Sequence, residues 1–146
     1  MLQCKKLDPN AILPTVAHPG EDLAYDLYAR FDMTLDPYIT NKVPTGIAAV
    51  WKRHRLSDTN YGLLIRDRSS VALSGLYVVG GVIDSGYRGE IVVLLRTSGS
   101  TLIDIKAGQK IAQMIPLPVL TSDEIEEVNE LPLSERGTDG FGSTGN

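Results

Sequence analysis

The sequence predicts a single all-β domain, a sandwich or a barrel built from short strands. Two observations predict it. Apolar residues recur mostly with a period of two, and 14 glycines and 8 prolines divide the chain at the spacing of strands and turns. With 146 residues, of which 42% are hydrophobic and 22% are charged, the chain is long and apolar enough for one globular core.

The first strand is predicted at residues 24–31, where apolar and polar side chains alternate. The expected core face carries Tyr25, Leu27, Ala29 and Phe31, and the opposite face carries Asp26, Tyr28 and Arg30. Short apolar runs predict further strands at residues 47–51, 61–65, 76–79, 91–95 and 111–115.

Helix signals are scarce. Residues 69–73 favour one short helix of at most about two turns. Residues 121–124 resemble a helix-capping box, although the residues after them also alternate as in a strand. No repeat or linker interrupts residues 1–135, which are predicted to form one β domain with one short helix.

The net charge of −4 is unevenly distributed. Residues 121–139 contain seven acidic residues and one arginine, so they carry −6 and the remainder carries +2. An acidic chain is a poor candidate for binding long nucleic acid. We interpret the basic run at residues 52–55 as a solvated loop. The arginines at positions 66, 68, 88 and 96 fit a small polyanion better than a polymer.

The chain shows no signal peptide and no apolar run of the roughly 18 residues that span a membrane, so a cytoplasmic protein with no membrane partner is expected. Its single cysteine, Cys4, excludes an internal disulfide framework and a multi-cysteine zinc site. The two histidines, His18 and His54, have no ligand spacing and are expected at the surface.

Residues 136–146 contain four glycines and one large apolar side chain, Phe141, and they are expected to form a flexible C-terminal tail. One interpretation is a frayed terminus. The alternative is a flap, because an arginine, a ring, hydroxyls and accessible N–H groups suit the binding of phosphates and a base. The string at residues 140–145 is G-x-G-x-x-G, but no helix can follow it, which excludes a dinucleotide-binding fold.

Arg68, Ser69 and Ser70 open the predicted helix and form a candidate anion site. The alternative is that this segment only caps the helix, with Asp67 or Ser69 as the N-cap residue. Asp84 lies between an apolar strand and a turn, where it is either a turn residue or a carboxylate that holds and deprotonates a water.

Gln113 lies between Ile111 and Ile115 on one face of a predicted strand. Its amide is therefore expected to point inward. A buried amide must find hydrogen-bond partners, so this residue is a candidate for the site.

Together, five segments in order resemble the five motifs of the trimeric dUTP diphosphatases (dUTPases). Each motif is weak alone, whereas five in the right order are specific, and the resemblance extends from about residue 20 to the C-terminus. The segments are residues 23–29 (LAYDLYA), 67–72 (DRSSVA), 81–89 (GVIDSGYRG), 108–113 (GQKIAQ) and 136–145 (RGTDGFGSTG).

The resemblance implies a jelly-roll-like β domain that assembles as a homotrimer, with active sites shared between subunits and closed by the tail. The implied reaction is hydrolysis of dUTP to dUMP and diphosphate, with Mg²⁺ bound to the triphosphate. Phosphoryl chemistry depends mainly on positioning and charge neutralisation, which arginines, N–H groups and a metal supply.

The resemblance also implies roles for individual residues. Asp84 matches the aspartate that activates the attacking water, Gln113 the glutamine near the α-phosphate, and Asp26 the aspartate that reaches metal-bound water. Tyr87 matches the tyrosine that packs on deoxyribose, and Phe141 the ring that stacks on uracil. Phosphate contacts are matched by Arg68, Ser69, Ser70, Arg136, Ser143 and Thr144, and further substrate-binding positions by Gly81, Ile83 and Gly142.

Five positions depart from the family pattern: Ala24, Asp67, Val78, Val79 and Asp139. None removes a group that the chemistry needs. Asp67 places a negative charge beside the expected phosphate site, so its carboxylate must point away from that site.

Two rival functions remain. The dCTP deaminases share the fold and the Arg-Ser-Ser string, but they carry a catalytic glutamate where this chain has Leu94. A non-catalytic nucleotide-binding trimer is the other rival. The presence of Asp84, Tyr87, Gln113 and the complete tail motif argues against it.

Overall fold

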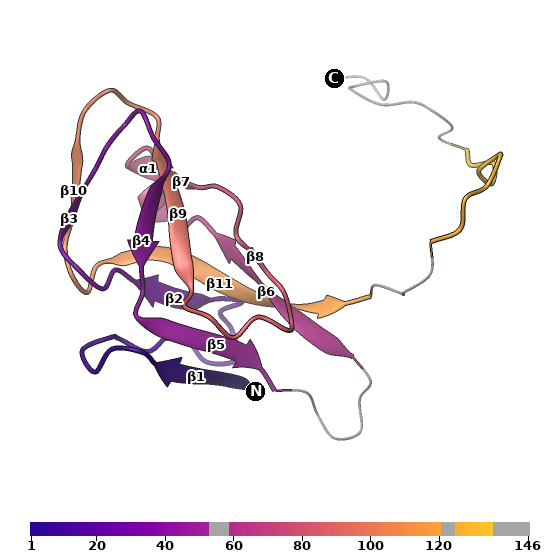
Figure 1. The fold of residues 1–146 in the computed structure, drawn as a ribbon, viewed down its shortest axis with the longest axis horizontal. Coiled ribbons are helices and arrows are strands. Elements are labelled where there is room, and N and C mark those ends of the chain that lie inside the picture. Colours follow the sequence, from indigo (N-terminus) through magenta and orange to yellow (C-terminus); the bar gives the residue numbers. More distant parts are fainter. Residues whose placement is uncertain (53–58, 121–124, 136–146) are drawn as a thin grey trace.

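The computed structural model describes residues 1–52, 59–120 and 125–135. These residues form eleven strands and one short helix (Figure 1), which confirms the all-β prediction. The elements are β1 (Leu2–Lys6), β2 (Tyr25–Tyr28), β3 (Met33–Leu35), β4 (Asn41–Pro44), β5 (Ile47–Trp51), β6 (Asn60–Arg66), α1 (Ser69–Leu73), β7 (Leu76–Val78), β8 (Val82–Ile83), β9 (Val92–Thr97), β10 (Ile103–Ile105) and β11 (Lys110–Val119).

The strands pair antiparallel in four sheets. The largest has the order β2-β11-β6-β8, and a three-stranded sheet has the order β4-β9-β7. Two-stranded sheets are formed by β1 with β5 and by β10 with β3. Short antiparallel strands in crossing sheets are the arrangement of a jelly-roll-like sandwich.

One hydrophobic core joins the two larger sheets. Leu27, Ile65 and Met114 come from the four-stranded sheet, and Val43 and Leu95 come from the three-stranded sheet; all five belong to one cluster of buried side chains. Buried and more exposed residues alternate in β9 and in the second half of β6, as the period of two predicts. This core fixes β2 and β11, the strands that carry Asp26 and Gln113.

A β-bulge in β11 changes the face on which Gln113 lies. Lys110 is opposite Tyr28 and Ala112 is opposite Leu27, so Ile111 is an extra residue in the pairing. Beyond it, Ala112 and Met114 are buried, whereas Gln113 is half-buried on the opposite face. The prediction that Gln113 points inward with Ile111 was therefore wrong.

The other strand predictions are largely confirmed. Strands occupy all five predicted later runs, and α1 covers residues 69–73 as predicted. The first strand ends at Tyr28, earlier than predicted, and Phe31 is 50% exposed rather than buried. The guanidinium of Arg30 lies over the Phe31 ring, 4.6 Å from its centroid, which stabilises the ring outside the core.

Two further predictions concern the helix and the membrane. Arg68, not Asp67 or Ser69, is the N-cap residue of α1, and no side chain caps it, so the alternative that Asp67 or Ser69 caps this helix was wrong. In the described residues, no helix is long and apolar enough to cross a membrane. The possible capping box at residues 121–124 and the tail at 136–146 lie outside the described residues.

Candidate active site

A polar pocket of about 430 Å³ lies where β2, β11 and the start of α1 meet the loop before β2. We call it the polar pocket. The loop contributes His18 and Asp22 to its wall. The strands and the helix contribute Asp26, Arg68, Ser69, Lys110 and Gln113.

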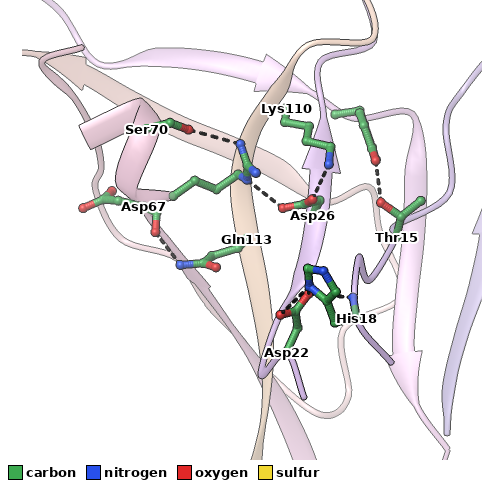
Figure 2. A network of polar contacts seen from close by, with 10 residues as sticks. Thr15, His18, Asp22, Asp26, Asp67, Ser70, Lys110 and Gln113 are labelled. Atoms are coloured by element: carbon green, nitrogen blue, oxygen red, sulfur yellow. Dashed lines mark hydrogen bonds and ion pairs between the residues drawn. The ribbon is translucent and has the colours of Figure 1, made fainter. Parts of the chain in front are cut away.

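Asp26 is at the centre of the polar contacts in this pocket (Figure 2). Its backbone N–H donates to the Thr15 carbonyl at 2.8 Å, and it is opposite Gln113 in the pairing of β2 with β11. Arg68 Nε donates to its Oδ1 at 2.6 Å, and Lys110 Nζ lies 2.7 Å from its Oδ2. Only 15% of the side chain is exposed, so the carboxylate is held with a cation on each oxygen.

Lys110 is a site residue that sequence reasoning missed. The hydrogen bond to Asp26, and then the charge of Asp26, raise the pKa of Lys110 above its ordinary value. The two residues meet diagonally across the strand pair, because Lys110 is opposite Tyr28. This contact depends on the register between strands that are far apart in the sequence, which one sequence does not reveal.

Arg68 and its neighbours occupy the start of α1. Arg68 Nη1 donates to Ser70 Oγ at 3.3 Å, and Ser69 and Ser70 are exposed. The carboxylate of Asp67 accepts a hydrogen bond from the Val78 N–H, so it points toward β7 and away from the polar pocket. The negative charge at position 67 therefore does not lie among the candidate phosphate ligands.

A hydrogen bond holds the side-chain amide of Gln113. Its Nε2 donates to the backbone carbonyl of Asp67 at 2.6 Å, which links β11 to the residue before α1. The partner expected for this amide is therefore present, on the pocket face of the strand rather than in the core. Because Nε2 is held by this bond, the side-chain oxygen Oε1 of Gln113 is held in position in the pocket wall too.

Asp84 and Tyr87 lie elsewhere in the chain, on the loop between β8 and β9, two strands of different sheets; we call this loop (residues 84–91) the hairpin. They line a separate, mainly apolar cavity of about 330 Å³, with Ile83 and Leu94 among its other walls. We call it the hairpin pocket. Asp84 is exposed and Tyr87 is 44% exposed. The described structure thus brings together Asp26, Arg68, Ser69 and Gln113, but not Asp84 and Tyr87 with them.

Backbone contacts fix the hairpin. The Tyr87 N–H donates to the Asp84 carbonyl at 3.0 Å, and the Tyr87 hydroxyl donates to the Glu90 carbonyl at 3.0 Å. Gly81 has a φ of +90°, and a Cβ there would lie 2.6 Å from the Ile65 carbonyl oxygen. Its own carbonyl accepts the Ile65 N–H, so a glycine is required where the chain enters β8 beside β6.

The described residues contain no group of three or more His, Cys, Asp or Glu side chains that is arranged to hold a metal ion. Asp26 is one of two carboxylates in the wall of the polar pocket, with Asp22, and offers the oxygen ligands that Mg²⁺ prefers. Mg²⁺ usually keeps several of its waters when it is bound with substrate phosphates, and Asp26 fits a contact with the ion through such a water. The predicted tail residues Arg136, Phe141, Gly142, Ser143 and Thr144 lie outside the described residues.

Comparisons with known proteins agree on one family. The dUTPase family model matches residues 10–145. The deoxyuridine 5'-triphosphate nucleotidohydrolase of Picosynechococcus sp. is 41% identical over 147 residues, and the alignment covers 99% of this chain and 98% of the relative. The protein of that name from Clostridium novyi is 42% identical, with the same coverage.

Solved structures give the same result. The dUTPase of Staphylococcus bacteriophage 80alpha with dUpNHpp has a TM-score of 0.83 at 27% identity, covering 100% of this chain and 99% of that chain. A mutant dUTPase from phage phi11 of S. aureus, described as coordinating a structural Mg(II) ion, has a TM-score of 0.75 at 23% identity. The alignment covers 90% of this chain and 98% of that chain. At this identity, the match supports the fold alone. The family match and the full-length relatives show that this chain belongs to the dUTPase family of nucleotide hydrolases.

Proposed function

We propose that the chain hydrolyses dUTP to dUMP and diphosphate at sites shared between the subunits of a homotrimer, with Asp84 as the base that activates the attacking water. One observation supports this most directly. The candidate phosphate ligands lie in the polar pocket, whereas Asp84 and Tyr87 line the hairpin pocket. A general base must be within hydrogen-bond reach of the proton that it removes. A second copy of the chain therefore supplies the hairpin that completes each polar pocket.

In the polar pocket, Arg68 and Ser69 bind the phosphates, and Ser70 supports them through its contact with Arg68. Arginine suits this role because its planar group offers several N–H donors with a permanent charge. Gln113 is held by its Nε2 and turns its carbonyl oxygen to the attacking water, which it orients for attack on the α-phosphorus.

Asp26 would hold Mg²⁺ indirectly, through a water bound to the ion. Both of its carboxylate oxygens are already bonded to cations, so the free lone pairs suit metal-bound water better than direct coordination. When bound to the triphosphate, Mg²⁺ neutralises charge that develops on the phosphate oxygens.

The hairpin recognises the nucleoside and supplies the base. Asp84 removes a proton from the water, and its exposure leaves the carboxylate accessible to a site that another subunit completes. Tyr87 packs on the deoxyribose and disfavours a 2′-hydroxyl. Backbone groups at Gly81 and Ile83 read the uracil edge.

We assign residues 1–135 to the β domain and residues 136–146 to a flap that closes a site. Arg136, Ser143 and Thr144 bind the β- and γ-phosphates, Gly142 lets the backbone approach them, and Phe141 stacks on uracil. Closure excludes all water except the attacking molecule. Deletion of residues 136–146 should leave the melting temperature unchanged and abolish most turnover; a normal turnover would contradict the flap.

Subunit complementation tests the shared site. Arg68→Gln weakens the phosphate half and Asp84→Asn inactivates the catalytic half, so at dUTP concentrations well below KM each homotrimer should be much less active than the wild type. Random co-assembly of equal amounts should restore about a quarter of the wild-type sites, because each restored site needs the intact half from both partners. No recovery would show that each site belongs to one subunit. Assays with dCTP provide the specificity control, since Leu94 lines the hairpin pocket where the deaminases carry a glutamate.

A further inference from the structure

We propose that Lys110 is a positioning residue for this hydrolysis: it holds one oxygen of Asp26 and so keeps Arg68 available to the triphosphate. The inference rests on the proposed roles of Asp26 and Arg68 and deepens them. It assigns Lys110 no direct contact with substrate.

The geometry begins with where Lys110 lies. It is the first residue of β11, directly before the bulge at Ile111, and it is opposite Tyr28. The side chain reaches diagonally across the strand pair, so that Nζ lies 2.7 Å from Asp26 Oδ2 (Figure 2). The bulge and the pairing register thus place a cation on one oxygen of the carboxylate.

The other oxygen of Asp26 shows what this contact does. Arg68 reaches Oδ1 through Nε alone, and its Nη1 donates instead to Ser70. An arginine and a carboxylate usually prefer two parallel hydrogen bonds, one to each oxygen. Because Lys110 already binds Oδ2, Arg68 is held through one nitrogen at the edge of the polar pocket.

Loss of Lys110 would therefore change how Arg68 pairs with Asp26. The carboxylate of Asp26 would turn toward the guanidinium and accept two N–H bonds from it. A guanidinium paired in this way has fewer donors for a phosphate and its charge is neutralised more completely. The consequence is weaker triphosphate binding, transmitted through Asp26.

The chain offers a matched control. Lys106 also pairs with an aspartate, since its Nζ lies 3.2 Å from Asp32 Oδ2. Both of these side chains are well exposed and neither lines the polar pocket. Lys106→Met removes a lysine–aspartate ion pair and one positive charge four residues from Lys110. It therefore measures how the loss of one surface charge alone affects binding.

The test measures binding of dUpNHpp with Mg²⁺ by calorimetry, together with KM and kcat for dUTP. Lys110→Met should weaken binding about ten-fold, the size of a coupling within one polar network, and raise KM more than it lowers kcat. Lys110→Arg and Lys106→Met should bind within about two-fold of the wild type. Lys110→Gln is the second variant, should Lys110→Met melt at a lower temperature than the wild type.

The Asp26→Asn background decides how Lys110 acts. If Lys110 acts through Asp26, adding Lys110→Met to Asp26→Asn should cost no more than about two-fold in binding. A ten-fold loss in that background would mean that Lys110 contacts phosphate directly and would overturn the inference. Equal binding by Lys110→Met and the wild type would overturn it as well. Normal binding and turnover by Asp26→Asn alone would instead contradict the proposed role of Asp26.

Discussion

The polar pocket and the hairpin hold their functional groups in opposite ways. In the polar pocket, charged side chains hold one another, with Asp26 bonded to both Arg68 and Lys110. On the hairpin, the fixing bonds end on backbone carbonyls, and the side chains of Asp84 and Tyr87 are exposed. Under the proposed function, this difference means that one chain would organise its phosphate ligands by itself and would present Asp84 and Tyr87 to the site of another subunit.

The comparison also explains why the two regions should respond differently to mutation. A change in the polar pocket leaves a charged neighbour without its partner, so binding and local structure change together. A change to an exposed hairpin side chain leaves the scaffold intact, because the backbone hydrogen bond from the Tyr87 N–H to the Asp84 carbonyl remains. The predictions below use this contrast, from the largest expected effect to the smallest.

Asp84→Asn should have the largest effect. It keeps the shape of the side chain and removes its basicity, so kcat should fall by about 10² to 10⁴, the usual contribution of a positioned base. Binding of dUpNHpp should change much less, since the polar pocket is intact. Single-turnover rates and calorimetry on one preparation measure both quantities.

The alternative for Asp84 is a turn residue with no chemical role. In that case Asp84→Asn would lower the melting temperature and leave normal chemistry in the protein that stays folded. Because the side chain is exposed, we expect the melting temperature to stay within about one degree of the wild type.

Arg68→Gln should have the next largest effect. Hydrogen bonds between charged groups contribute about 1.5 to 3 kcal/mol, so kcat/KM should fall by about 10- to 100-fold, mainly through KM. The matched control is Arg88→Gln on the hairpin, where Nη1 donates to the carbonyls of Ser85 and Tyr87. If Arg88→Gln raised KM as much as Arg68→Gln, the residues that bind the phosphates of dUTP would not be confined to the polar pocket.

Sequence reasoning predicted the parts of this molecule that depend on local pattern. Short apolar runs separated by glycine and proline predicted the later strands, and the short run at residues 69–73 predicted α1. The polar pocket depends on the register between β2 and β11, which lie some 80 residues apart along the chain. One extra residue at Ile111 reversed the face of Gln113, and the same register placed Lys110 beside Asp26. A period of two cannot reveal an insertion that only the partner strand defines.

Tyr87→Ala should alter selectivity more than rate. Without the ring, the ratio of kcat/KM for UTP to that for dUTP should rise about ten-fold, in the range that steric exclusion of one small group provides. Tyr87→Phe keeps the ring and loses only the hydrogen bond to the Glu90 carbonyl, so it should retain the wild-type ratio. A raised ratio in Tyr87→Phe would assign selectivity to the hydroxyl, and an unchanged ratio in Tyr87→Ala would remove Tyr87 from this role.

The smallest effect is expected from Asp22, at the rim of the polar pocket. The hydrogen bond from the His18 N–H lowers the pKa of the Asp22 carboxyl below its ordinary value, with the His18 side chain adding to the shift. A carboxyl whose pKa is lower in the folded state stabilises the fold above its unfolded pKa, near 4, and this contribution disappears as the pH falls through the lowered value. Asp22→Asn should therefore melt slightly below the wild type at pH 7, and the two melting temperatures should converge toward pH 3. A difference in melting temperature that stayed constant from pH 7 to pH 3 would show that the charge of Asp22 does not stabilise the loop before β2. The stabilising charge–charge contacts of the polar pocket would then include Asp26 but not Asp22.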